Sequence, residues 1–344
     1  MTIFKKVLTI AAVIIFSILF VVFTKEVAES TIKSINVCIN VIIPSMFAFM
    51  VISSYILSSG IYKIIFKPLY LTIGRVFNLD EKSFSIFLLS LIGGYPIGIK
   101  LIKEEIAQNK NYSAIAEKLV MFCYCISPPF AITMIGLNLY NSFEIGTIIY
   151  ISNVISCIVI GIILSRIYKL RFKEANSQKY KGGIVDSVNS SSASLFKICS
   201  MIVFFNIGIA VVDAVLNSIG IALPTTVRAF LEISNILDFK PEISHLPLVS
   251  AISSFGGVCV ILQCYAIAEK KIPFKDFILA RIPTAILSAL VTKSIISFSE
   301  ISVPTSSGNG NYLFIFSSNK LVVILLIIIC TILLQNNEKN FKKG

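Results

Sequence analysis

Two pairs of adjacent glycines interrupt apolar segments of the chain. The first pair is Gly93-Gly94 and the second is Gly256-Gly257. Glycine and the proline that follows the first pair disfavour a continuous helix, so each segment is predicted to break at its glycines. A broken helix has free N–H groups at one end and free C=O groups at the other. The partial charges of these groups can hold an ion or a polar solute.

The residues beside the two breaks offer hydroxyl, amide, backbone and charged groups to a ligand. At the first break they are Ser90, Gly93, Gly94, Tyr95, Pro96 and Lys100, and at the second they are Ser254, Phe255, Gly256, Gly257 and Gln263. Lys100 follows the first break by about one helical turn, where its charge would suit an anionic ligand. The alternative use of glycine in a membrane helix is close packing against a neighbouring helix.

Two further groups of residues are candidate contacts. Ser127 precedes two consecutive prolines, which remove two backbone donors and leave carbonyl groups one turn earlier without partners. This arrangement is either a simple kink or a polar lining. Glu232, Ser234 and Asn235 lie toward the end of an amphipathic stretch at residues 222–238, where they could reach a ligand or form the solvated face of an interfacial helix.

Residue types that carry catalysis or bind metals are sparse. The eight cysteines all fall within apolar runs without a Cys-x-x-Cys pair, and His245 is the only histidine. Neither a nucleophile–base arrangement nor a set of metal ligands is visible. The sequence therefore predicts no catalytic residue, no metal, no cofactor and no enzymatic activity.

The composition places these residues in a membrane protein. Of the 344 residues, 56% are hydrophobic and 14% are charged, against about a quarter charged in soluble domains. This balance excludes a soluble enzyme. The net charge of +12 lies in short loops between apolar runs, which is typical of membrane topology rather than of nucleic-acid binding. The lipid bilayer is therefore a predicted partner and nucleic acid is not, while assembly into a homo-oligomer stays open.

Seven apolar segments have about the length that a bilayer demands. They are residues 7–23, 35–57, 119–137, 145–167, 194–216, 277–298 and 321–334. The two segments with glycine breaks, residues 83–102 and 246–268, are predicted to form re-entrant helical hairpins, because broken backbone at membrane depth needs protein or water to satisfy it. The alternative, a full span, stays open for residues 246–268.

An internal repeat relates the two halves of the chain. Aligning the glycine pairs gives an offset of 256 − 93 = 163 residues, which carries residues 35–57 close to 194–216 and residues 119–137 close to 277–298. Each half reads as a span, an interfacial helix, a hairpin and two spans. Since three crossings are an odd number, the second half must be inverted. The predicted fold is an all-α polytopic membrane protein with an inverted repeat and two re-entrant hairpins.

This repeat divides the chain into four parts. They are an N-terminal span with an outer loop (1–34), the first repeat (35–167), a polar linker (168–193) and the inverted second repeat (194–344). Lysines and arginines in the first half fit a cytoplasmic N-terminus by the positive-inside rule. Inversion places Lys270, Lys271 and the lysines of the tail outside, so the side of the C-terminus stays open.

Five motifs connect the chain to a known family. They are Pro44-Ser45-Met46-Phe47-Ala48-Phe49, Gly94-Tyr95-Pro96-Ile97-Gly98-Ile99-Lys100-Leu101, Ser127-Pro128-Pro129-Phe130, Leu231-Glu232-Ile233-Ser234-Asn235 and Phe255-Gly256-Gly257 with Gln263. Together they resemble the sporulation integral membrane protein YlbJ family of the nucleoside-transporter gate-domain group, over residues 35–334. The resemblance implies a fold like that of concentrative nucleoside transporters. It also implies movement of dipicolinic acid between mother cell and forespore, and hence a place in the forespore membrane.

The sequence therefore predicts an integral membrane transporter or facilitator of a small, polar, anionic solute, working by alternating access around the two hairpin tips. Lys100 would complement the negative charge of the solute. A nucleoside or nucleobase is the alternative solute, because amides and Glu232 suit it. A non-transporting membrane scaffold required for sporulation is the alternative of a different class.

Overall fold

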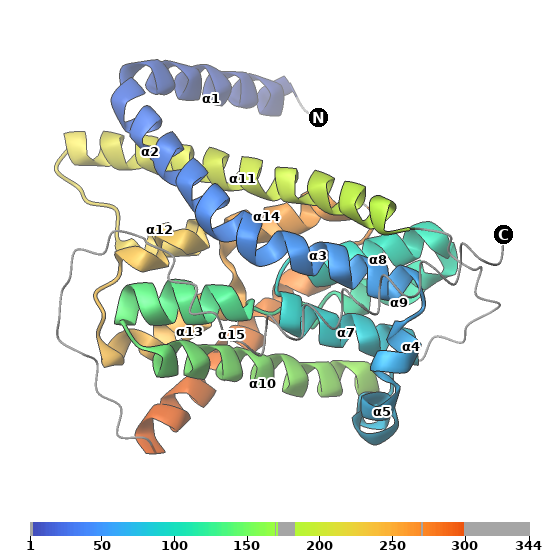
Figure 1. Ribbon diagram of the computed structural model, residues 1–344. Coiled ribbons are helices and arrows are strands. Elements are labelled where there is room, and N and C mark those ends of the chain that lie inside the picture. The colour runs from blue at the N-terminus through green and yellow to red at the C-terminus, as the bar shows by residue number, and fades with distance from the viewer. Residues whose placement is uncertain (1–2, 169, 171–182, 270, 299–344) are drawn as a thin grey trace. The chain divides into compact units, whose positions relative to one another are not determined.

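We describe the protein from a computed structural model. It describes residues 3–168, 170, 183–269 and 271–298, which all fall within one unit of the chain, residues 1–306. Every regular element of this part is helical (Figure 1). Residues 169 and 171–182 of the predicted linker lie outside the described residues, as do the predicted last span at residues 321–334 and the C-terminal tail. The end of the predicted linker, residues 184–193, is helical.

Six helical segments of the described part are long and apolar enough to cross a membrane. Four of them are single helices: α1 (Ile3–Val22), α10 (Phe143–Ile167), α11 (Ile184–Ser218) and α15 (Lys275–Phe298). The fifth is a continuous run of α2 (Thr24–Val37), η1 (Cys38–Ile42) and α3 (Ile43–Ser58). The sixth is a run of η6 (Ile243–His245), α13 (Leu246–Phe255) and α14 (Gly257–Ala268). These segments make the chain an integral membrane protein by length and composition.

The structure confirms apolar helices at five predicted spans, residues 7–23, 35–57, 145–167, 194–216 and 277–298. The prediction of a continuous span at residues 119–137 is wrong. Helix α9 (Ser113–Leu119) ends where that span should begin, and the π-helix η4 (Phe130–Leu139) begins only after the two prolines. The backbone of residues 120–127 is not helical, and donors from other elements bind the carbonyl groups of Met121, Tyr124 and Cys125.

The long helical run of α2, η1 and α3 packs along α11 (Figure 1). Pro44 stands in the first turn of α3, where a missing N–H costs no helical hydrogen bond. Helix α11 begins within the predicted linker, at Ile184, and Ser187 and Ser190 of its first half lie near Ser54 of α3 and Glu104 of α8. These two elements are the ones that the predicted repeat pairs with each other.

The first glycine break separates two helices that pack against each other, α7 (Glu81–Gly93) and α8 (Ile97–Gln108). The Asp80 side chain caps α7 by accepting a hydrogen bond of 3.1 Å from the Ser83 N–H. Gly94 ends α7 with a φ of +78°, a conformation that favours glycine. This arrangement fits the predicted first hairpin, whose place in a membrane stays a prediction.

The second break occurs at Gly256, which has a φ of +86° and joins α13 to α14. Helix α13 packs mainly on α15 and α10, whereas α14 packs on α11 and α8. The run as a whole is long enough for a single span, so a hairpin at this place also stays a prediction. Gly257 has a positive φ of +79° as well, and it follows Gly94 by 257 − 94 = 163 positions, the offset that the glycine pairs predict.

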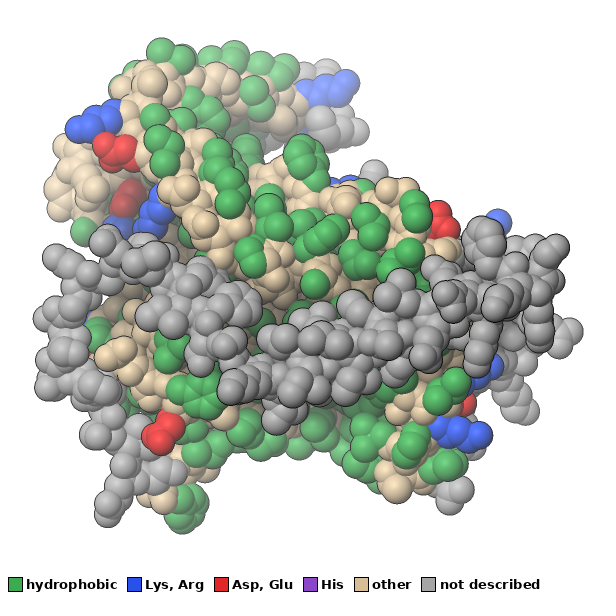
Figure 2. Space-filling model, viewed as in Figure 1, with side chains coloured by type: hydrophobic (Ala, Val, Ile, Leu, Met, Phe, Trp, Pro, Cys, Tyr) green, Lys and Arg blue, Asp and Glu red, His purple; other side chains and the backbone are tan. Residues whose placement is uncertain are grey.

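Short helical pieces occupy the two stretches that were predicted as interfacial helices. In the first half they are α4 (Tyr62–Ile65), α5 (Lys67–Leu69), η2 (Tyr70–Gly74) and α6 (Arg75–Phe77), and in the second half they are α12 (Thr225–Leu231) and η5 (Ile233–Asp238). On the face drawn in Figure 2, hydrophobic side chains cover much of the described surface and charged side chains lie toward its margins. Such a surface suits contact with lipid.

Candidate functional site

The two glycine breaks and the non-helical residues 120–127 meet at one junction. The N–H of Tyr95 donates a hydrogen bond of 2.6 Å to the carbonyl of Cys125. A side chain at Gly94 would lie only 2.5 Å from the Cβ of Ser127. The first break is therefore in backbone contact with residues 120–127, and glycine at position 94 is required by both its φ and this close approach.

Tyr95 links the first break to the second. Its ring stacks on that of Tyr124, with centroids 4.7 Å apart and an interplanar angle of 23°. Its hydroxyl donates a hydrogen bond of 3.3 Å to the carbonyl of Ser253, within α13. The first hairpin tip therefore touches both other parts of the junction.

Tyr124 makes the matching contact from the non-helical segment. Its hydroxyl donates a hydrogen bond of 3.1 Å to the carbonyl of Phe255. A side chain at Gly256 would clash with this hydroxyl. Gly256 is therefore needed for the Tyr124 contact as well as for its positive φ.

Helix α12 closes the junction beside the second break. The ring of Phe230 stacks on that of Phe255, with centroids 4.8 Å apart and an interplanar angle of 25°. A Cβ at Gly257 would lie 3.0 Å from the carbonyl oxygen of Phe230. The loop that carries Glu232 thus lies directly against the second tip.

Arg281, on α15, is a fully buried cation at this junction, and the sequence analysis missed it. Its guanidinium donates hydrogen bonds to the carbonyls of Met121 and Tyr124, the latter at 3.2 Å, and lies 4.7 Å from the centroid of the Tyr124 ring. Its Nε has no hydrogen-bond partner, and no carboxylate of the described residues forms an ion pair with it. An arginine within an apolar run was the signal that could have identified it.

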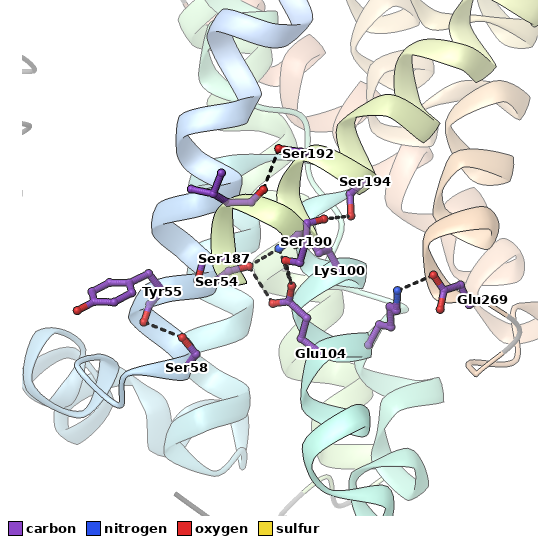
Figure 3. A network of polar contacts seen from close by, with 12 residues as sticks. Ser54, Tyr55, Ser58, Lys100, Glu104, Ser187, Ser190, Ser192, Ser194 and Glu269 are labelled. Carbon is purple, nitrogen blue, oxygen red and sulfur yellow. Dashed lines mark hydrogen bonds and ion pairs between the residues drawn. The ribbon is translucent and has the colours of Figure 1, made fainter. Parts of the chain in front are cut away.

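Lys100 lies in a different network, shown in Figure 3. Its ammonium group donates a hydrogen bond to the Ser54 hydroxyl and forms an ion pair of 2.6 Å with Glu104, one turn along α8. Glu104 also accepts hydrogen bonds of 2.8 Å from Ser54 and 2.7 Å from Ser190. The structure therefore brings Lys100 together with α3 and α11 rather than with the two tips, and Glu104 neutralises its charge.

A small pocket lies beside this network. It is lined by Ser54, Leu57, Ser58, Glu104, Gln108, Asp186, Ser187 and Ser190. Nearby, Glu269 forms ion pairs of 2.8 Å with Lys103 and 2.9 Å with Lys197, and these two lysines hold the pKa of Glu269 well below its usual range. Because Lys103 is on α8 and Lys197 on α11, Glu269 ties the end of α14 to both helices.

The predicted group of Glu232, Ser234 and Asn235 forms a third network. Glu232 is 1% exposed and accepts hydrogen bonds from the N–H of Ser234, at 2.8 Å, and from its hydroxyl. Asn235 donates a hydrogen bond of 3.0 Å to the amide oxygen of Asn206 on α11. Burial raises the pKa of Glu232, and the hydrogen bonds from Ser234 offset part of this rise.

The remaining predicted residues make local contacts. Ser90 donates to the Phe87 carbonyl at 2.6 Å, the Ser127 hydroxyl accepts from the Phe130 N–H at 3.4 Å, and Gln263 contacts the sulfur of Cys259 at 3.2 Å. Ser254 is buried in α13 beside the second tip. Pro96 precedes α8 in the first tip, so the junction gathers the tip residues but leaves Lys100 apart.

Among the described residues there is no group of three or more histidine, cysteine, aspartate or glutamate side chains that could hold a metal ion. The junction consists instead of aromatic rings, backbone carbonyls and one arginine. No family model, no curated protein and no solved structure matches the chain. The resemblance to the YlbJ family therefore stays a prediction from the motifs.

Proposed function

We propose that the chain is a membrane transporter or facilitator for a small, polar, anionic solute that binds where the two tips meet residues 120–127. The observation that carries this proposal is the convergence of three interrupted apolar segments at one buried junction. Non-helical backbone at membrane depth is tolerated where protein or a cavity satisfies it, and such breaks typically form substrate sites in secondary transporters.

The charges of the junction favour an anion. Helices α8 and α14 both begin at a tip, so their N-terminal N–H groups and positive dipole ends lie there. Arg281 adds a buried guanidinium whose Nε is free to donate a hydrogen bond. A carboxylate ligand would accept such donors, and a buried cation without a counter-charge is otherwise costly. Dipicolinic acid, which the family resemblance implies, is a dicarboxylic acid of this class.

Alternating access requires the junction to open and close. The hydrogen bonds from Tyr95 to Ser253 and from Tyr124 to Phe255 join the parts of the junction in this structure. We propose that these contacts break when the solute enters, while α3 and α11 remain as the framework. Since each bond contributes about 1 kcal/mol, two of them are compatible with a reversible gate.

Transport by purified protein in liposomes tests the proposal. We expect uptake of radiolabelled dipicolinate above that of empty liposomes, and a loss of uptake in Arg281→Gln that exceeds the loss in the exposed control Arg166→Gln. Uptake of a nucleoside but not of dipicolinate would favour the alternative solute class. Folded protein that carries neither solute would favour the scaffold and contradict the proposal.

Cysteine accessibility tests the two hairpins separately from transport. Single cysteines placed along residues 84–102 and 246–268 are labelled from each side of the membrane. In a hairpin, both ends of the segment are labelled from the same side. Labelling of the two ends from opposite sides would identify a full span and would remove the hairpin at that segment.

A further inference from the structure

Glu232 is a buried carboxylic acid without a cationic partner among the described residues. It lies between the candidate spans α11 and the run Ile243–Ala268, and its side chain is inaccessible to solvent. Its carboxylate accepts hydrogen bonds from the N–H and hydroxyl of Ser234, and the Asn206 amide also stabilises its charged form. No lysine, arginine or histidine of the described part forms an ion pair with it.

The groups that face Glu232 come from each element packed around it. They are Lys33 on α2, Cys38 on η1, Asn206 on α11, Cys259 on α14 and Tyr95 at the first tip. Lys33 is the only one of them with a positive charge. Its side chain is 66% exposed and is directed to Asp238, at 3.6 Å, so water screens much of its effect on Glu232.

Burial without a counter-charge favours the neutral form of a carboxylic acid. The two hydrogen bonds from Ser234 favour the charged form but do not compensate for burial, so the pKa of Glu232 is raised. An acid in this state exchanges its proton near neutral pH rather than in strong acid. Buried carboxyl groups within membrane proteins often serve as proton carriers for this reason.

The position of Glu232 connects its protonation to the junction. Phe230, two residues earlier, stacks on Phe255, and backbone atoms of Ala229, Phe230 and Ile233 lie close to Gly257. Ionisation of Glu232 would bring a negative charge beneath the second tip and would require water or a cation to approach it. Opening of the tip is the movement that admits water, so ionisation and opening favour each other.

We propose that Glu232 is a proton-binding site that couples proton movement to movement of the anionic solute. The carboxylate takes one proton from the solvent when the junction is open to one side, forming a neutral O–H group, and releases it to the solvent on the other side. One proton carried with a dicarboxylate dianion reduces the charge of the transported set from two negative charges to one. This inference rests on the proposed function and adds the coupling ion to it.

Thermal stability against pH tests proton binding without any transport. The folded protein binds the Glu232 proton more tightly than the unfolded chain, so this group lowers stability as pH rises above its ordinary pKa of ~4.3. We expect the Tm of the wild type to fall relative to that of Glu232→Gln between about pH 5 and pH 8. Glu242→Gln, an exposed glutamate of the same loop, should follow the wild type. A difference between wild type and Glu232→Gln that does not change with pH would overturn proton binding.

Solute flux tests whether transport is coupled to protons. The response of the wild-type protein to a pH gradient decides this question, so the result does not depend on whether Glu232→Gln folds. Dipicolinate uptake into liposomes is measured with and without a pH gradient, with the membrane potential clamped by valinomycin and potassium. We expect a several-fold increase when the proton gradient is directed inward, and no increase in Glu232→Gln. Flux that ignores the gradient would overturn the coupling alone. Absence of flux under every gradient would overturn the proposed function together with the coupling, while the Tm comparison would still decide whether Glu232 binds the proton.

Discussion

The hydroxyl of Tyr124 donates a hydrogen bond to the backbone carbonyl of Phe255, 3.1 Å away and 131 residues later in the chain. This contact joins the non-helical residues 120–127 to the second glycine break. The ring of the same tyrosine stacks on Tyr95 at the first break. Tyr124 therefore contacts both tips of the candidate site.

Removal of the Tyr124 hydroxyl should loosen this junction. We expect Tyr124→Phe to lower the free energy of unfolding by about 0.5–1.5 kcal/mol, because one hydrogen bond is lost while the ring contacts remain. Chemical unfolding in detergent measures the difference. Tyr265→Phe, at an exposed tyrosine of α14, is the control and should change the stability little. An equal loss in both variants would contradict the role of the Tyr124 contact.

Alanine at Gly256 should disrupt the site far more than alanine at Gly60. Both glycines have a positive φ, +86° and +78°, so both substitutions add backbone strain of ~1–2 kcal/mol. Only the Cβ at position 256 would also clash with the Tyr124 hydroxyl, whereas nothing lies within 4 Å of a Cβ at position 60. We expect Gly256→Ala to abolish uptake and Gly60→Ala to retain it. Equal uptake by the two variants would mean that the close approach is not needed.

Arg281→Gln should be strongly destabilising. The change removes a donor from the buried carbonyl of Met121 and leaves that of Tyr124 with the weak Cys157 thiol as a donor, at a cost of ~2 kcal/mol or more. Arg166 also donates to a backbone carbonyl, that of Val76 at 2.9 Å, but it lies at the surface. Arg166→Gln should therefore cost less than about 1 kcal/mol. Measured unfolding energies that differ by less than this margin would contradict the buried role of Arg281.

A double-mutant cycle of Lys100→Met and Glu104→Gln tests the ion pair of Figure 3. We expect the single Lys100→Met change to cost about 3 kcal/mol, and the double variant to cost less than the sum of the single changes. The cycle of Lys103 and Glu269, which are more exposed, should give a coupling below ~1 kcal/mol. Because Glu104 neutralises Lys100, dipicolinate affinity should change little in Lys100→Met. A large loss of affinity would restore the ligand role that the sequence predicts.

Acid should weaken the connection that Glu269 makes between α8 and α11. The neighbouring lysines lower the pKa of this carboxyl, so its stabilising effect is present above the ordinary pKa of ~4.3 and is lost as pH falls through that value. We expect acidification to lower the Tm of Glu269→Gln less than it lowers the Tm of the wild type. High salt should reduce the difference, because the pairs are partly exposed. A difference that persists in 1 M salt would contradict the electrostatic origin, since screening then acts within ~3 Å.

The apolar helices and the two breaks could be predicted because their signals are local. Hydropathy over about 20 residues identifies a helix long enough for a bilayer, and α10 and α11 follow this rule. Gly94 and Gly256 identify the breaks because few other residues adopt a positive φ. The second glycine of each pair, Gly94 and Gly257, has a positive φ, and the two are separated by the predicted 163 residues, while Gly256 has a positive φ in addition.

The interior of the junction could not be predicted in the same way. The two prolines lack the N–H groups for the carbonyls of Tyr124 and Cys125, as the sequence predicts, but the sequence does not show that Arg281 and Tyr95 donate to these carbonyls, or that the helix already ends at Leu119. These donors come from other elements, so no local pattern reveals them. The position of Lys100 one turn after the first break predicted that its side chain lies beside the tips. In the structure this side chain extends from α8 to Ser54 and Glu104 instead.

The hydrogen bonds that Arg281 gives to residues 120–127 also affect the biogenesis of the protein. Arg281 follows Met121 by 160 residues, so the ribosome releases the Met121 carbonyl group long before this donor exists. A backbone group without a partner is costly inside a bilayer. Residues 120–127 must therefore stay at an aqueous or protein-lined site until α15 has been inserted. The junction is thus among the last parts of the protein to assemble, and chains truncated before α15 should be substrates for membrane quality-control proteases.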